Sequence, residues 1–249
     1  MPSGPFHPVV LVHGAWHGAW CFTKLVDALT RLGVPVSVPD LPGHGSDSGE
    51  LGDLAADAAR VRDVLASIDG PAVVLGHSYG GLVISEAASD PATASGITHL
   101  VYLCAIVTAP GSSFLELPVD PAQSRLSPLI RMGDNGRSCI DTSDLAAAKA
   151  AFYGDCSDAD VAYAAANLCD QPMGNMANPI SGDPLATIAA TYIRCTEDRA
   201  IPIEAQDAMI ASASATAIAF TTMTLEASHS PFFSMPDALA DQLAALARR

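Results

Sequence analysis

Short runs of apolar, largely β-branched residues alternate along the chain with longer stretches whose apolar positions recur at helical spacing. This alternation predicts parallel strands joined by helices, and therefore an α/β fold. The predicted strands cover residues 8–13, 34–39, 72–75, 99–107, 191–195 and 217–224. The predicted helices cover residues 19–32, 51–68, 79–89, 203–211 and 236–248, and Ser234 is the candidate N-cap of the last helix.

The interval between the fourth and fifth predicted strands breaks this rhythm. A structureless loop of that length is uncommon in a compact domain, so we expect residues 109–189 to form a helical cap, or lid, over one end of the sheet. Ser143 is the candidate cap of a helix over 145–153, and Ser157 is the candidate cap of a second helix that ends near Leu168. We expect residues 1–249 to form one domain that contains this insertion.

The six residues GHSYGG, positions 76–81, follow the apolar run 72–75 and precede another apolar stretch. The pattern G-x-S-x-G at a strand-to-helix junction is the nucleophile-elbow pattern. A nucleophile in such a strained turn needs neighbours without bulk, and Gly76 and Gly80 provide them. We therefore expect the Ser78 hydroxyl to project from the carboxyl edge of the sheet.

A serine hydroxyl becomes a good nucleophile only when a base takes its proton and a carboxylate orients that base. Candidates for both groups follow in the chain order serine, acid, histidine. His229 lies just past the last predicted strand, and Asp198 lies just past the preceding one. The neighbouring Glu197 is the alternative acid. All three groups would meet at one edge of the sheet, because the carboxyl ends of parallel strands lie together.

Attack on a carbonyl creates an oxyanion, which backbone N–H groups can stabilise. The N–H of Tyr79, at the predicted start of a helix, is one candidate donor. The segment VLVHGAWHGAW offers the second at Ala15, where His13 and Gly14 end the first strand and turn the backbone inward. One such donor contributes about 3 to 4 kcal/mol to transition-state stabilisation, so this segment matters nearly as much as the base. We also expect that residue 14 must be small.

Five segments carry a family resemblance: VLVHGAWHGAW, DLPGHG, LGHSYGGL, CTEDRAIP and ASHSPFFSMP. With them the chain resembles the α/β-hydrolase superfamily, in the branch of plant methylesterases, salicylate-binding esterases, hydroxynitrile lyases and bacterial esterases of the pyrethroid-hydrolase type. The resemblance covers most of the core and is weak in the insertion. It implies the α/β-hydrolase fold, with a mostly parallel sheet of about six strands flanked by helices. It also favours Asp198 over Glu197, because Asp198 occupies the D-x-x-I-P position.

The motifs and the resemblance together predict a carboxylic ester hydrolase that works through an acyl-enzyme on Ser78. His229 would act as the base, Asp198 would orient it, and the N–H groups of Ala15 and Tyr79 would form the oxyanion hole. This chemistry requires no metal and no organic cofactor.

The composition of the insertion narrows the substrate. Its Met, Phe, Tyr and Leu residues favour a small, uncharged, largely hydrophobic ester, while lactones and thioesters stay open. The residues expected to contact the substrate are Trp16, His17, Phe114, Met132 and Phe152. Packing within the insertion is the alternative interpretation for Phe114, Met132 and Phe152, as it is for Met173, Met176 and Tyr153.

Two other functions fit part of the same pattern. Hydroxynitrile lyases on this scaffold resemble the chain in HGAW and the triad, but typically carry Thr where Gly14 stands and Lys where Ser230 follows the histidine. A ligand-binding receptor with slowed turnover is the second alternative, since fold alone does not fix function. Haloalkane dehalogenases and epoxide hydrolases share the fold but place Asp at position 78, so the sequence disfavours them.

Other histidines have simpler explanations than chemistry. His13 and His77 precede the oxyanion and nucleophile turns, where a neutral ring bonded to the backbone is a sufficient account. His44 has a similar place in a loop. The Gly43-x-Gly45 pair in the same loop lacks the third glycine and the helix start of a dinucleotide site, so it predicts a turn.

The formal charge of −15 and a pI near 4.5 disfavour nucleic acid as a partner. The N-terminal residues do not show a basic stretch followed by an apolar one, as a secretion leader would, and the sequence contains no apolar run long enough to span a membrane. We therefore expect a cytoplasmic protein with a small-molecule substrate and no membrane partner. The six cysteines are scattered, which favours reduced thiols over a metal site. A bridge between Cys139 and Cys156 and a homodimer are both left open.

Overall fold

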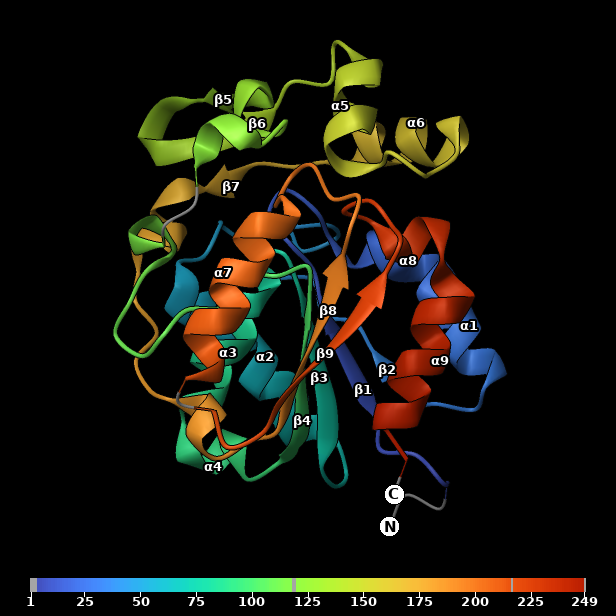
Figure 1. The fold of residues 1–249 in the computed structure, drawn as a ribbon, viewed down its shortest axis with the longest axis vertical. Coiled ribbons are helices and arrows are strands. Elements are labelled where there is room, and N and C mark those ends of the chain that lie inside the picture. The colour runs from blue at the N-terminus through green and yellow to red at the C-terminus, as the bar shows by residue number, and fades with distance from the viewer. Residues whose placement is uncertain (1–3, 118–119, 216, 249) are drawn as a thin grey trace.

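The computed structural model describes residues 4–117, 120–215 and 217–248 (Figure 1). Residues 1–3, which belong to the N-terminal stretch expected not to be a secretion leader, lie outside this part of the chain. So do residues 118–119, which fall within the predicted insertion.

Six parallel strands form the central sheet in the spatial order β2-β1-β3-β4-β8-β9. Their bounds are β1 Val9–Val12, β2 Val36–Ser37, β3 Ala72–His77, β4 Ile97–Leu103, β8 Ala190–Cys195 and β9 Phe220–Leu225. β1 and β3 are buried along their whole length, because central parallel strands are covered by helices on both faces. The predicted α/β-hydrolase sheet is confirmed.

The strand order reverses between β1 and β3, and this reversal indicates where a ligand would bind. After β1 the chain moves to β2 at one edge, then crosses back to β3 and continues toward β9. The register pairs Val12 at the end of β1 with Gly76 in β3, so the segments that follow these two strands begin side by side. In open α/β sheets ligands bind at the carboxyl ends of strands at such a switch point.

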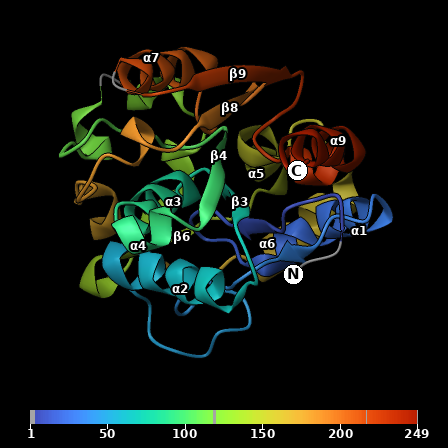
Figure 2. The same cartoon turned by 90° about the horizontal axis from the view of Figure 1, so that it is seen from below.

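Helices cover both faces of the sheet (Figures 1 and 2). α1 Thr23–Arg31 and α9 Pro236–Leu246 pack together on one face, and α2 Leu54–Ser67, α3 Gly80–Ala88 and α7 Ile203–Ser214 lie on the other. The shorter helices are α4 Pro91–Ala94, α8 Pro231–Ser234 and the 3-10 turns η1 Ala19–Phe22, η2 Phe114–Glu116, η3 Pro121–Gln123, η4 Ser127–Leu129, η5 Asp134–Gly136, η6 Met173–Ala177 and η7 Pro184–Ala186. None of the helices in the described ranges is both long and apolar enough to cross a membrane.

The predicted strands and core helices are present, with shifted ends. β4 stops at Leu103 rather than at residue 107, because Cys104 has a φ of 34° and leaves the extended conformation. α2 begins at Leu54, three residues later than predicted, where the side chain of Asp53 accepts a hydrogen bond from the N–H of Ala56.

Two predicted caps are wrong and one is confirmed. Asp144, not Ser143, caps α5 Leu145–Phe152, since its carboxylate accepts from two N–H groups of the first turn. Ser234 does not cap α9: it ends α8, and Met235 stands at the cap position without a side-chain hydrogen bond. Ser157 caps α6 Asp158–Asn167 as predicted.

The middle of the segment between β4 and β8, which contains α5, α6, β5 Ile130–Met132 and β6 Arg137–Ile140, lies over the carboxyl ends of the strands (Figure 1). Its two helices, α5 and α6, match the prediction. The segment also contains an antiparallel sheet of three short strands, β5, β6 and β7 Gln171–Pro172, so the insertion is not purely helical. Strands of two to four residues are too short to show an alternating pattern in the sequence.

Candidate active site

The turn after β3 requires glycine on both sides of Ser78. A Cβ on Gly76 would lie 2.4 Å from the carbonyl oxygen of Gly80, and a Cβ on Gly80 would lie 2.6 Å from that of Val12. Both distances are far inside van der Waals contact. The G-x-S-x-G spacing therefore exists because the strand, the turn and the first turn of α3 pack backbone against backbone.

Three non-glycine residues of the described chain have positive φ, and all lie at this edge of the sheet. They are Trp16 at 62°, Ser78 at 53° and Cys104 at 34°, in the segments that follow β1, β3 and β4. Strained backbone of this kind persists where the surroundings hold it, and it is common at active sites. Here the Ser78 N–H donates to the Leu103 carbonyl at 3.2 Å, and the Ile106 N–H donates to the Ser78 carbonyl at 2.9 Å.

The segment after β1 runs directly against the nucleophile turn. A Cβ on Gly14 would lie 2.8 Å from the Cβ of Ser78, so this position tolerates no side chain without movement. His13 is buried and bridges the segment: its Nδ1 lies 2.9 Å from the Gly14 carbonyl, and its Nε2 accepts from the Leu41 N–H at 3.1 Å. Burial lowers the pKa of His13 to about 3, so the ring is neutral and structural, as predicted.

The two predicted oxyanion donors belong to the residues that directly follow Gly14 and Ser78, which pack against each other. The N–H groups of Ala15 and Tyr79 take part in no backbone or side-chain hydrogen bond within the described residues. Buried backbone N–H groups are nearly always paired, and unpaired ones call for an explanation. Both residues are almost completely buried, Ala15 at 3% and Tyr79 at 0% exposure.

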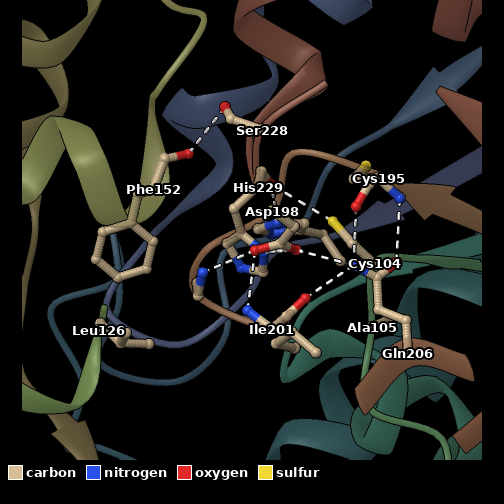
Figure 3. Close-up of polar contacts among 12 residues, drawn as sticks. Cys104, Ala105, Leu126, Phe152, Cys195, Asp198, Ile201, Gln206, Ser228 and His229 are labelled. Carbon is tan, nitrogen blue, oxygen red and sulfur yellow. Dashed lines mark hydrogen bonds and ion pairs between the residues drawn. The ribbon is translucent and has the colours of Figure 1, made fainter. Parts of the chain in front are cut away.

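His229 and Asp198 form a buried pair. The Nδ1 of His229 lies 2.6 Å from Oδ2 of Asp198, with side-chain exposures of 1% and 0%. The other carboxylate oxygen, Oδ1, accepts from the N–H groups of Ala200 and Ile201 at 2.8 and 2.9 Å (Figure 3). Because a carboxylate only accepts, Nδ1 of His229 carries the proton and Nε2 of the neutral ring presents its lone pair. Glu197, the alternative acid, is exposed.

The backbone of His229 is tied to the residue before Ser78. His77 Nε2 lies 2.9 Å from the His229 carbonyl oxygen, and Cys104 Sγ donates to the same oxygen at 3.5 Å. Burial holds the pKa of His77 well below its usual range, so this ring is neutral and supports the backbone, as predicted. The structure contains no hydrogen bond between the Ser78 hydroxyl and His229 in the part of the chain it describes, so proton transfer between them belongs to the proposal below.

His77, Cys104 and His229 are also the one group among the described residues whose ligand atoms lie close enough to hold a metal ion. Each of these side chains already has a hydrogen-bonding partner. His77 and Cys104 bind the His229 carbonyl, and the His229 ring binds Asp198. The hydrogen bonds among these three residues support the backbone and ring of His229, while Nδ1 of His77 has no hydrogen-bonding partner in the described chain.

A cavity of about 210 Å³ opens beside Ser78. The described residues that line it are Trp16, Ser78, Ile106, Phe114, Leu115, Leu117, Ser124, Leu126, Ser127, Ile130, Met173, Met176, Ala200 and Ile201. None of these side chains carries a charge, and nine of the fourteen come from the insertion. The sequence alone did not identify Ile201 or the apolar residues around 115–130 as part of the cavity wall. For Ile201, its position three residues after the candidate acid was a signal that could have placed it near the site.

The five residues expected to contact the substrate fall into two groups. Trp16 and Phe114 line the cavity, whereas His17, Met132 and Phe152 are not among the described lining residues. Met132 is 62% exposed at the end of β5. Phe152 is buried behind the site, with its ring centroid 5.8 Å from that of His229.

His17 points into the interior rather than into the cavity. Its Nδ1 lies 2.8 Å from the Ala15 carbonyl and its Nε2 lies 2.8 Å from the Tyr153 hydroxyl. Burial lowers the pKa of His17 to about 4, so the ring is neutral. It links the segment after β1 to α5, which sequence spacing alone could not reveal. Of the cysteines, Cys139 is exposed and Cys156 is buried, and both are free thiols.

Comparison with known proteins places these features in a family. A model of the alpha/beta hydrolase family matches residues 9–242. The chain is 35% identical over 250 residues to a pyrethroid hydrolase of Sphingobium wenxiniae, covering 95% of this chain and 86% of that one. It is 30% identical to putative methylesterase 11 of Arabidopsis thaliana, covering 96% of this chain but 63% of that protein.

Solved structures agree with the sequence comparison. The crystal structure of a pyrethroid hydrolase from Sphingobium faniae superimposes with a TM-score of 0.81 at 29% identity, over 96% of each chain. The agreement extends over the sheet, the helices and the insertion, because almost the whole of both chains is matched. The chain belongs to the alpha/beta hydrolase family.

Proposed function

We propose that this protein is a serine hydrolase that cleaves small, uncharged, largely hydrophobic carboxylic esters through an acyl-enzyme on Ser78. One observation carries the proposal: a strained serine faces an apolar cavity, while the residue before it holds the backbone of a histidine that is paired with a buried carboxylate. The hydrolase and esterase relatives support the same class of reaction.

The reaction has two halves. In the first, Ser78 Oγ attacks the ester carbonyl carbon while Nε2 of His229 accepts the hydroxyl proton, which then passes to the departing alcohol. In the second, His229 takes a proton from water, the resulting hydroxide attacks the acyl-enzyme, and the carboxylic acid leaves as Ser78 regains its proton. Asp198 holds Nδ1 protonated and stabilises the positive ring formed in each half.

The tetrahedral intermediates carry a negative oxygen, and the unpaired N–H groups of Ala15 and Tyr79 are its proposed donors. Donors that are fixed before the reaction begins stabilise the developing charge without having to reorganise. The close packing of Gly14 against Ser78 keeps the Ala15 segment beside the reacting carbonyl.

The size and chemistry of the cavity define the substrate class. Its wall has no charged side chain among the described residues, so burying an ionised substrate there would be unfavourable. A volume of about 210 Å³ lies below the roughly 300 to 1,000 Å³ of typical small-molecule sites, which favours a small substrate. One short acyl or alkoxy group fits this space, and the 70% exposed Leu115 on its wall leaves the rest of the ester near solvent.

The structure gives two physical arguments against cyanohydrin cleavage. Threonine at position 14 would collide with the Cβ of Ser78, and the position after the histidine holds Ser230, whose hydroxyl is buried without a hydrogen-bonding partner in the described chain. A buried neutral hydroxyl supplies no positive charge to hold cyanide.

A panel of p-nitrophenyl esters from acetate to dodecanoate tests the proposal. We expect turnover of the short esters by the wild type, a loss of at least about a thousandfold in Ser78→Ala, and near wild-type turnover in Ser85→Ala. Ser85 is a matched control, because it is a buried serine of α3 that bonds Gly81 and Tyr102 away from the cavity. Undiminished turnover in Ser78→Ala refutes the proposal, tight ester binding without turnover indicates a receptor, and cyanide release from mandelonitrile indicates a lyase.

A further inference from the structure

Helix α2 buries a carboxyl group that has no cation beside it in the described structure. Asp57 is 0% exposed, and its Oδ2 accepts from the Tyr79 hydroxyl at 2.6 Å and from Nδ2 of Asn175 at 3.3 Å. Its other oxygen, Oδ1, has no hydrogen-bonding partner among the described residues. Burying a carboxyl group with an unpaired oxygen is unfavourable, so its presence here calls for an explanation.

Asn175 connects this carboxyl group to the wall of the cavity. Its Nδ2 also lies 3.1 Å from the Tyr79 hydroxyl and 3.0 Å from the Gly52 carbonyl, and its side chain is buried. Asn175 is the middle residue of η6, between Met173 and Met176, which both line the cavity. The position of this wall is therefore set by hydrogen bonds to α2 and to Tyr79.

Tyr79 is the second link to the active site. It directly follows Ser78, its ring is completely buried, and its unpaired backbone N–H is the proposed oxyanion donor. The hydroxyl of Tyr79 anchors the far end of this side chain, so movement of the ring would move the peptide at its base. Burial raises the pKa of Tyr79 well above its usual range, so the hydroxyl keeps its proton and donates to Asp57.

We propose that Asp57 is a positioning residue of the active site: through Tyr79 it fixes the N–H beside Ser78, and through Asn175 it fixes the wall that Met173 and Met176 form. The inference rests on the proposed function, because an oxyanion donor matters only for acyl transfer. Asp57 touches neither the cavity nor the reacting atoms, so its effect is transmitted by the two side chains that bind it.

The hydrogen bonds of Asp57 with Tyr79 and with Asn175 are the two arms of a network, and each arm should affect a different kinetic constant. Misplacing a group that stabilises the transition state lowers kcat, whereas a displaced wall weakens binding of the substrate chain and raises KM. We therefore expect the Tyr79 arm to affect kcat for all esters and the Asn175 arm to affect KM for the esters whose chains fill the cavity.

Tyr79→Phe removes one hydroxyl and keeps the backbone N–H, so it tests the first arm. Its matched control is Tyr102→Phe, since Tyr102 is equally buried and its hydroxyl bonds Ser85 at 2.9 Å outside the site. We expect kcat for p-nitrophenyl acetate to fall about tenfold in Tyr79→Phe with KM within about twofold, and to stay within about twofold of wild type in Tyr102→Phe.

Two further variants test the carboxyl group and the wall. Asp57→Asn keeps an oxygen that can accept from Tyr79, so we expect it to retain kcat within about threefold, while Asp57→Ala should lose about tenfold or more. Asn175→Ala should raise KM for p-nitrophenyl butyrate about fivefold or more and change kcat less.

The outcomes separate this inference from the proposed function. If Ser78→Ala abolishes turnover but Tyr79→Phe and Asp57→Ala keep kcat within about twofold of wild type, the network is only structural and the positioning role is refuted. Equal losses of kcat in Tyr79→Phe and Tyr102→Phe refute it as well. If Ser78→Ala retains turnover, the proposed function itself fails. Melting temperatures identify any variant that is unfolded, and the milder Tyr79→Phe and Asp57→Asn then decide the result.

Discussion

Replacing Asp57 by asparagine removes a titrating group from the interior of the protein, and the change should appear as a pH dependence of stability. Burial raises the pKa of Asp57 from 3.8 to about 7, the hydrogen bonds from Tyr79 and Asn175 oppose this increase, and the nearby Asp53 adds to it. Asparagine cannot titrate, so the difference between wild type and Asp57→Asn isolates this one group.

The direction follows from proton binding. Between pH 3.8 and about 7 the folded protein keeps the Asp57 proton while the unfolded chain releases it. The unfolding free energy of the wild type therefore falls as pH rises through this window, relative to that of the variant. The pKa rises by about three pH units on folding, which at about 1.4 kcal/mol per unit corresponds to about 4 kcal/mol over the whole window.

Urea unfolding followed by tryptophan fluorescence measures this difference. Between pH 5 and pH 7 the unfolding free energy of Asp57→Asn minus that of the wild type should increase by about 2 kcal/mol. Hydrogen bonds altered by the substitution change this difference by the same amount at every pH, so they do not affect its slope with pH. Asp63→Asn is the control, because it removes an exposed carboxylate from the same helix. A difference that stays flat from pH 5 to pH 8 would contradict a carboxyl group held neutral by burial.

Three further changes have defined outcomes. Gly76→Ala would place its Cβ 2.4 Å from the Gly80 carbonyl, so it should lower the unfolding free energy in urea by roughly 1 to 3 kcal/mol and reduce ester turnover. Asp155→Ala removes one of the two acceptors of the hydroxyl of Ser228, which precedes His229, and should lower the unfolding free energy by about 1 kcal/mol, measured by urea titration. Met176→Ala enlarges the cavity, so kcat/KM should shift toward longer p-nitrophenyl esters; an unchanged chain-length profile would place the substrate elsewhere.

The sequence predicted the parts of the molecule that depend on local physics. The strand at 72–77 begins with an apolar run, the strand at 190–195 is rich in β-branched and aromatic residues, and the helix after Ser157 has its cap and its apolar positions within one short segment. The motif around Ser78 could be recognised in the sequence because its two glycines lie within four residues of one another, although the contact that requires Gly80 is made by Val12 of the distant β1. The cap at Ser143 was wrong because the adjacent Asp144 accepts the hydrogen bonds of the first turn, and the cap at Ser234 was wrong because that residue ends the short helix α8, which the sequence did not predict.

Contacts between distant segments were decided by the tertiary structure. Asp198 and Glu197 are neighbours with the same chemistry, and only the turn after β8 shows that Asp198 meets His229. The sequence position of His17 predicts a residue of the pocket, yet its side chain points into the interior, where it bonds the hydroxyl of Tyr153, 136 positions away.

The sequence by itself therefore determined the strands and helices of the core and the motif around Ser78, because each depends on residues close together in the chain. The acid and the histidine could be predicted from their order along the chain and their places after predicted strands. The tertiary structure decided which side chains line the cavity and joined Asp57, Tyr79 and Asn175, because helices and loops far apart in sequence bury these polar groups against one another. Burial is a property of the whole packed chain, and it is burial that changes the pKa of Asp57 and leaves an oxygen without a partner.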